Sequence, residues 1–459
     1  MLILGVFLIL LVGFLAVSAF STRFSLVERE GLAFPVGVGL VTFMMLLADG
    51  VGLPLSGGMN LLYSLLLVAG FGAVLWKRRA ELTSSLQIDV RGFLSRTNLV
   101  WLLLLGVLVW VEYANLEKCM FFPTYDRDSM AAFDTIGYLI AQEKTLSGLS
   151  IFQGDYMTAI HGAGSTISYT PMLQLSYAFV YSLGAETSKL IPGLMFLSFL
   201  FAFYGITVRF TSRIAAMAAT LLMAITPEMI AFSSLSATNV IHAVTASLGV
   251  LYVVGWFVRG QRCDLWLGAL LLAINVWCRA EGVVFIGAAG LLVLVRAVRT
   301  RYYFSLLPVI CALLPALVWS LYLKLNGMYA ESIAITHLFW DAAKADIIYV
   351  HAKELLGNTQ YYGWSFPAFW LAVVCSAWFV FKRRDTYWMP AVVLVALAAY
   401  FLVLYQIDYK WDRIENVLNY SAKRFLFCYI PLVWFYVATC YPVRTVMERA
   451  EQWLDTRKD

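Results

Sequence analysis

The stretch NLVWLLLLGVLVWVEYAN (residues 98–115) is followed closely by YDRDSMAAFD (residues 125–134). The first is an apolar run long enough to cross a bilayer as a helix, and the second gathers three aspartates and an arginine. The chain as a whole is 61% hydrophobic and only 13% charged. The apolar run therefore indicates a membrane protein, and the carboxylates that follow it are unusual for such a chain.

Similar apolar runs recur along the whole sequence. They predict about thirteen spans, near residues 1–20, 32–50, 59–76, 98–115, 190–208, 214–228, 238–258, 265–278, 282–298, 303–323, 365–381, 388–405 and 425–441. The first run has no basic leader and no convincing cleavage site, which favours a permanent span over a signal peptide. The predicted fold class is an all-α polytopic membrane protein with interfacial helices on its outer face.

The basic residues predict the orientation, because Lys and Arg beside apolar spans are retained in the cytoplasm. The markers are the basic residues at 77–79, 209 and 213, 259 and 262, 296–301 and 382–384. Placing all of them inside puts the N-terminus outside and the C-terminus inside, provided that residues 171–184 do not span. We expect these residues, PMLQLSYAFVYSLG, to lie on the membrane as an interfacial helix. A spanning hairpin is the alternative, and it would break the charge pattern.

This topology divides the chain into a three-span extension (1–97), a catalytic module (98–441) and a cytoplasmic tail (442–459). Its outer loops are residues 116–189, 324–364 and 406–424. The seven cysteines show no disulfide framework and no zinc-binding spacing. The net charge of +5 is explained by the inside loops, so a nucleic acid partner is not implied.

The acidic segment opens the longest outer loop. From Met130 to Ile140, apolar residues recur at helical spacing and predict a surface helix along the membrane. Asp128 or Ser129 is expected to cap that helix. Asp126 precedes it and is not needed as its cap, so it is the best candidate for a functional carboxylate. The two-residue spacing of Asp126 and Asp128 leaves a divalent metal possible, although no cofactor is certain.

Three later motifs add to this pattern. They are ISYTPMLQLSYAF, with Tyr169 ahead of a proline, NVWCRAEGVVF, with Arg279 and Glu281, and YSAKRFLFCYIPL, with Lys423 and Arg424. Together with the acidic loop they resemble the GT-C glycosyltransferases over roughly residues 98–440. Members of that family are polytopic enzymes that take sugars from polyprenyl-phosphate carriers on the outer face. The chain is expected to depart from the family in having a three-span extension ahead of the span that leads into the acidic loop, and no outer soluble domain after the last span.

The resemblance implies a role for each candidate residue. An acceptor hydroxyl attacks the sugar and the carrier phosphate leaves, so the site needs a carboxylate base and cations. Asp126 is the predicted base, with Asp128 beside it, and Arg279, Lys423 and Arg424 are the predicted phosphate ligands. The possible sugar or acceptor contacts are His161, Tyr169, Glu281, His337 and Trp340.

Structural explanations for the same residues stay open. Arg279 and Glu281 can simply neutralise one another, and Lys423 and Arg424 can extend their charges to the interface. Asp128 can serve only as a helix cap.

Two other functions also stay open. One is a polymerase or ligase of lipid-linked polysaccharide, and the other is a transporter or lipid flippase. The resemblance favours a bacterial inner-membrane enzyme with its active site on the periplasmic or external face and an unknown glycan, lipid or protein acceptor.

Overall fold

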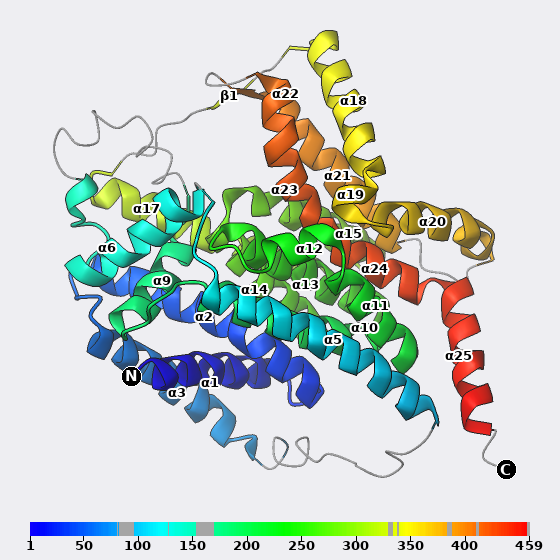
Figure 1. Ribbon diagram of the computed structural model, residues 1–459, viewed down its shortest axis with the longest axis horizontal. Helices are drawn as coiled ribbons and strands as arrows, with labels where there is room; N and C mark the ends of the chain where they lie inside the picture. Colours follow the sequence, from blue (N-terminus) through cyan, green and yellow to red (C-terminus); the bar gives the residue numbers. More distant parts are fainter. Residues whose placement is uncertain are drawn as a thin grey trace.

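The computed structural model of the chain is built almost entirely of helices (Figure 1). It describes residues 1–79, 81, 96–126, 128–152, 169–328, 334–336, 339–382, 388–409 and 413–456. The longer helices are α1 (Leu2–Phe20), α2 (Leu26–Gly50), α3 (Gly57–Trp76), α5 (Arg96–Phe121), α10 (Leu190–Thr207), α13 (Thr238–Arg259), α14 (Arg262–Cys278), α15 (Val283–Thr300), α18 (Ala342–Gly357), α20 (Ser365–Phe381), α21 (Trp388–Gln406) and α25 (Tyr441–Thr456).

Shorter elements connect these helices. The short α-helices are α6 (Thr135–Glu143), α9 (Met172–Ser182), α11 (Arg213–Ala224), α12 (Pro227–Phe232), α16 (Leu306–Cys311), α17 (Leu314–Leu325), α19 (Thr359–Tyr362), α22 (Ile414–Val417), α23 (Lys423–Leu426) and α24 (Ile430–Thr439). Single turns of other helix types are η1 (Ser129–Asp134), η2 (Ser150–Phe152), η3 (Ala280–Gly282), η4 (Tyr303–Ser305), η5 (Leu418–Ala422) and η6 (Phe427–Tyr429), of which η1 and η5 are π-helical. The strands are β1 (Ala334–Thr336) and β2 (Ile407–Tyr409).

The membrane character of the chain is supported by the length and composition of its helices. Within the described residues, eight helices are long and apolar enough to cross a bilayer, or up to ten if each of two bent helix pairs is one span. Helices α11 and α20 are apolar but shorter. The predicted runs are therefore helical, whereas the predicted count of thirteen spans is not confirmed.

Helix α13 forms the centre of the molecule. Every residue from Thr238 to Trp256 is buried, and α14 packs along it (Figure 1). Glycines permit this close approach, since a Cβ added to Gly268 would lie 2.8 Å from the Gly249 carbonyl oxygen. Because a single tight turn at Gly260 connects the two helices, they run antiparallel. One end of the pair therefore carries Thr238 and Cys278, and the other end carries Arg259 and Arg262.

The short helices after the acidic segment, which the sequence predicts on the membrane surface, pack against one another. All of α9 from Met172 to Val180 is buried in protein, so it is not an interfacial helix. The apolar face of α6 is covered by α9, and a Cβ on Gly137 would lie 2.5 Å from Cβ of Tyr177. The helical spacing was predicted correctly, but the partner of the apolar face is another helix instead of lipid.

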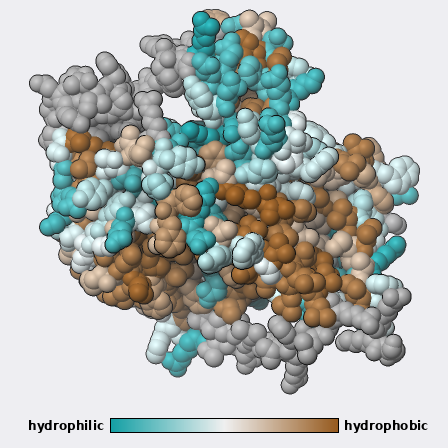
Figure 2. Space-filling model, viewed as in Figure 1, coloured by the Kyte–Doolittle hydropathy of each residue, from teal (hydrophilic) through white to brown (hydrophobic). Residues whose placement is uncertain are grey.

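A hydrophilic lobe projects from one side of the helical body. It contains α18, α22 and the two strands, and Figure 2 shows it as a teal region at the top, above a brown apolar band. The strands pair antiparallel, with Ile335 opposite Asp408. This pairing joins two segments that the sequence places in separate outer loops, at 324–364 and 406–424.

Candidate functional site

The acidic segment and the last basic segment of the predicted module contact one another. Arg424 Nη1 donates to Asp128 Oδ2 at 2.5 Å, across 296 residues of sequence. The other terminal nitrogen of Arg424 lies 3.7 Å from Asp126 Oδ1. The two carboxylates therefore share one guanidinium, at a place where two π-helical turns, η1 and η5, begin or end. Such turns are often found at functional sites.

Asp126 also holds the start of the helix that follows it. Its Oδ2 accepts hydrogen bonds from the backbone nitrogen of Ser129 at 3.2 Å and from the Ser129 hydroxyl at 3.3 Å. The expectation that Asp128 or Ser129 caps this helix, and that Asp126 is free of that task, is therefore wrong. The reason is geometric, because the N-cap carboxylate reaches the backbone nitrogen three residues ahead, which is the Asp126 to Ser129 spacing.

Arg279 forms the second ion pair of the site. It lies where α14 ends, and its guanidinium binds Glu281 through two nitrogens, at 2.7 and 3.3 Å. It also donates to the Thr238 hydroxyl at 3.5 Å, and its Cζ lies 5.8 Å from the centre of the Tyr169 ring. The mutual neutralisation considered from the sequence is thus present. The two-nitrogen grip fixes the plane of the guanidinium.

Tyr169 lies near Arg279, with its ring centre 5.8 Å from the guanidinium carbon. Burial raises the pKa of its hydroxyl, and the charges of Arg279, Glu281, Asp128 and Arg424 act on it as well. Those four groups are thus all within electrostatic range of one phenol. We call the residues gathered here the Asp–Arg cluster, which comprises Asp126, Asp128, Tyr169, Arg279, Glu281 and Arg424.

Lys423 precedes Arg424 in the sequence but has a different carboxylate partner. Its Nζ lies 2.8 Å from Glu228 Oε1 of α12 and 3.8 Å from the centre of the Tyr361 ring. The Glu228 side chain is buried, so Lys423 supplies the cation that this carboxylate needs. All three predicted phosphate ligands, Arg279, Lys423 and Arg424, therefore have a carboxylate partner in this structure.

Two polar residues near Arg279 were not selected from the sequence. His242 Nδ1 of α13 and the side-chain nitrogen of Asn275 of α14 lie 2.9 Å apart, and the His242 ring lies 5.6 Å from the ring of Phe425, the residue after Arg424. Glu228, the partner of Lys423, was also missed. The available signal was a polar residue within an apolar run, because such residues in membrane helices usually mark a buried interaction.

The remaining predicted contacts lie elsewhere or are undescribed. His161 and His337 fall outside the described residues. Trp340 is exposed and stacks on Tyr405, with ring centres 5.5 Å apart, near the strand pair. Among the residues that the structure describes, no group of three or more His, Cys, Asp or Glu side chains is arranged to hold a metal ion.

Comparison of the chain with protein-family models, with curated proteins and with solved structures found no match.

Proposed function

We propose that this protein is a glycosyltransferase of GT-C type that moves a sugar from a polyprenyl-phosphate carrier to an acceptor on the outer face of the membrane. The observation that carries the proposal is the contact of Asp126 and Asp128 with Arg424. It joins the two segments from which the sequence predicts a base and a phosphate ligand, and Tyr169 and the Arg279–Glu281 pair lie beside it.

The chemistry assigns one task to each side of this contact. A carboxylate accepts the proton of the acceptor hydroxyl while its oxygen attacks the anomeric carbon. The bond from that carbon to the phosphate oxygen breaks, and the phosphate leaves with the bonding electrons, which cations stabilise. Asp126 is the proposed base, because its capping hydrogen bonds hold Oδ2 and leave Oδ1 directed toward Arg424.

Arg424 is the proposed ligand of the leaving phosphate. In this structure it grips Asp128, and a bound phosphate would exchange with that carboxylate for the same nitrogen atoms. Asp128 is about half exposed, so releasing it into water carries a small penalty. Arg279 stays in its two-nitrogen grip on Glu281 and keeps its guanidinium near the Tyr169 ring. The proposed setting is a bacterial inner membrane with thirteen spans and the cluster on the periplasmic or external face.

The test uses the purified protein in nanodiscs with a panel of polyprenyl-phosphate sugars and a lipid and glycan extract as the source of acceptor. Release of polyprenyl phosphate is measured for wild type, Asp126→Asn and Asp128→Asn. We expect Asp126→Asn to lose about 10²- to 10⁴-fold in rate, which is the usual contribution of a general base. Asparagine is itself a good N-cap, so the start of the helix is kept.

Asp134→Asn is the matched control. Asp134 lies in the same segment, but its Oδ1 accepts a hydrogen bond from the Tyr181 hydroxyl at 2.6 Å, which an asparagine oxygen can also accept. Its rate should stay near that of wild type. Equal release by wild type and both cluster variants would contradict the site, and solute flux without donor consumption would support a transporter instead.

A further inference from the structure

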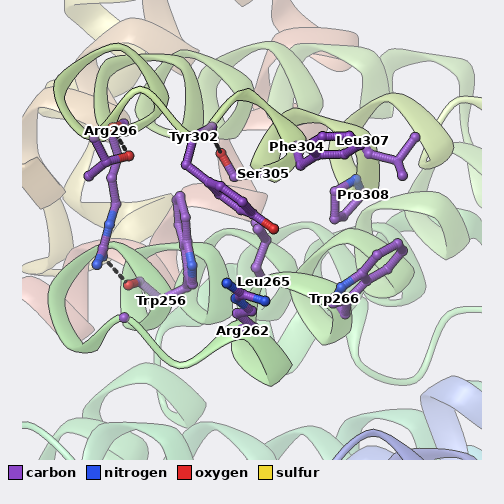
Figure 3. Close-up of a pocket in the computed structure, with 12 residues that line it drawn as sticks. Trp256, Arg262, Leu265, Trp266, Arg296, Tyr302, Phe304, Ser305, Leu307 and Pro308 are labelled. Atoms are coloured by element: carbon purple, nitrogen blue, oxygen red, sulfur yellow. Dashed lines mark hydrogen bonds between the residues drawn. The ribbon is translucent and has the colours of Figure 1, made fainter.

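A pocket of about 340 Å³ lies at the other end of α13 and α14 from the Asp–Arg cluster (Figure 3). Its wall is made by the last turn of α13, the first turns of α14, the end of α15 and the segment that leads into α16. A 22-residue helix is roughly 33 Å long, which is close to the roughly 30 Å thickness of a bilayer core. The pocket and the cluster therefore lie at opposite ends of a helix that is long enough to cross a bilayer.

Two arginines form the polar side of the pocket. Arg296 donates to the backbone carbonyl oxygens of Trp256 and Phe257, and its Cζ lies 4.7 Å from the centre of the Trp256 ring. Arg262 lies over the Tyr302 ring, with Cζ 5.1 Å from its centre. No acidic residue lines the pocket, and within the described residues neither arginine forms an ion pair.

Local backbone geometry supports this placement of the arginines. Gly260 has a φ of 78° at the end of α13, and a Cβ there would lie 3.0 Å from Arg296 Nη2. The glycine thus lets the guanidinium lie across the helix end.

Two hydroxyls, those of Thr300 and Ser305, also line the pocket. They donate to backbone oxygens, which leaves their own oxygens able to accept.

The other side of the pocket is apolar and opens outward. Trp266, Phe304 and Leu307 line it, and all three side chains are exposed. Figure 3 shows Arg296 at one end of the pocket and the Phe304, Leu307 and Trp266 side chains at the other, with Arg262 and Tyr302 between them. The pocket thus joins a basic end to an apolar surface of the kind that faces lipid chains.

We propose that this pocket binds the phosphate of an anionic phospholipid from the cytoplasmic leaflet. A pair of guanidiniums without carboxylate partners suits a phosphate, and basic pockets between membrane helices on this side bind lipid headgroups. The surrounding segments carry the arginine-rich markers that predict a cytoplasmic position. A lipid supplies both the anion and the chain that the exposed apolar end would contact, whereas free phosphate supplies only the anion.

The experiment measures lipid binding and does not depend on any transfer activity. The full chain is purified in detergent and titrated with phosphatidylglycerol, with phosphatidylcholine or with inorganic phosphate, and native mass spectrometry counts the bound molecules. We expect one phosphatidylglycerol to bind in preference to phosphatidylcholine. The affinity for phosphatidylglycerol should fall about fivefold in Arg262→Gln. Adding Arg296→Gln to this variant should lower the affinity by a similar factor.

Arg299→Gln is the matched control, because Arg299 lies on the same helix and packs over Trp388 outside the pocket. It removes the same charge and should leave the affinity unchanged. The contact that the structure shows for the Arg262 side chain is with the Tyr302 ring, so Arg262→Gln tests the site even if Arg296→Gln fails to fold. An equal loss in Arg299→Gln, no loss in Arg262→Gln, or binding of inorganic phosphate as tightly as the lipid would each overturn the proposal.

Discussion

Arg209 and Arg424 each lie between two carboxylates, but in opposite surroundings. Arg209 contacts Glu28 of α2 at 3.2 Å and Asp264 of α14 at 2.7 Å, and its side chain is 12% exposed while those of the acids are 4% and 0% exposed. Arg424 contacts Asp126 and Asp128, and its side chain is 31% exposed. The same arrangement of charges is thus buried around Arg209, at the start of α14, and partly exposed to water around Arg424, near the end of α14.

The burial of each arginine and its carboxylates decides whether a ligand can displace those partners. Burial by itself would lower the pKa of Arg209, but Asp264 and Glu28 raise it, so this guanidinium stays charged. The Tyr252 hydroxyl also donates to Glu28 at 3.1 Å, and α2, α13, α14 and the end of α10 are tied together. A ligand cannot displace such partners without leaving buried charges unpaired. The partners of Arg424 can be exchanged, because water solvates them when they are released.

The largest expected effect on stability comes from removing the positive charge of Arg209 from between its two buried carboxylates. Arg209→Gln leaves two carboxylates buried without a cation and should lower the free energy of unfolding by about 3–5 kcal/mol. Unfolding in mixed micelles, followed by tryptophan fluorescence, measures it. Arg213→Gln removes an exposed arginine nearby and serves as the control. A loss below about 1 kcal/mol would mean that the group behaves like a surface ion pair.

Glu28→Gln should have the next largest effect. Glutamine keeps an acceptor for the backbone nitrogen of Ser25, but Arg209 and Tyr252 lose a charged partner, at a cost of about 1.5–3 kcal/mol. Combining it with Arg209→Gln in a double-mutant cycle measures the coupling between the two residues. Strictly additive losses would show that the two side chains do not stabilise one another.

The two roles of Asp126, as a helix cap and as the proposed general base, can be tested separately. Asp126→Ala removes the helix cap and should cost about 1 kcal/mol of stability, whereas Asp126→Asn keeps the cap and should cost only a few tenths. Both variants should lose transfer activity if the carboxylate is the base. Thermal unfolding and polyprenyl-phosphate release are measured on the same samples. An active Asp126→Asn with an inactive Asp126→Ala would assign Asp126 to capping alone.

Arg424→Gln should have the smallest effect on stability, less than about 1 kcal/mol, because its ion pairs are partly exposed. Its effect on donor binding should be larger, and Arg424→Lys should restore only part of it, since lysine lacks the planar fork. Donor affinity and unfolding are compared for both variants. If Arg424→Gln lost as much stability as Arg209→Gln, the ion pairs of Arg424 would be structural. The two arginines would then no longer differ in what burial lets them do.

The sequence predicted the helices better than it predicted their partners. The apolar runs and the three- and four-residue spacing after Asp128 identify helices in the right places. The same patterns do not distinguish lipid from protein as the neighbour of an apolar face, which is why α9 was expected on the membrane and is buried. The segments with Asp128, Arg279 and Arg424 were all selected. His242, Asn275 and Glu228 were not, because their partners lie 30 residues or more away in the sequence.

The sequence by itself determined the helical, membrane-type character of the chain, because apolar length and composition are local properties that do not depend on folding. It also determined which segments carry charge. Only the tertiary structure decided that Asp128 contacts Arg424 across 296 residues and that Asp126 caps its own helix. It also decided that Arg209 is buried between two acids, whereas Arg262 and Arg296 have no acidic partner in the part of the chain that the structure describes. The reason is physical, since the behaviour of a charge depends on its partners and its access to water, and packing sets both.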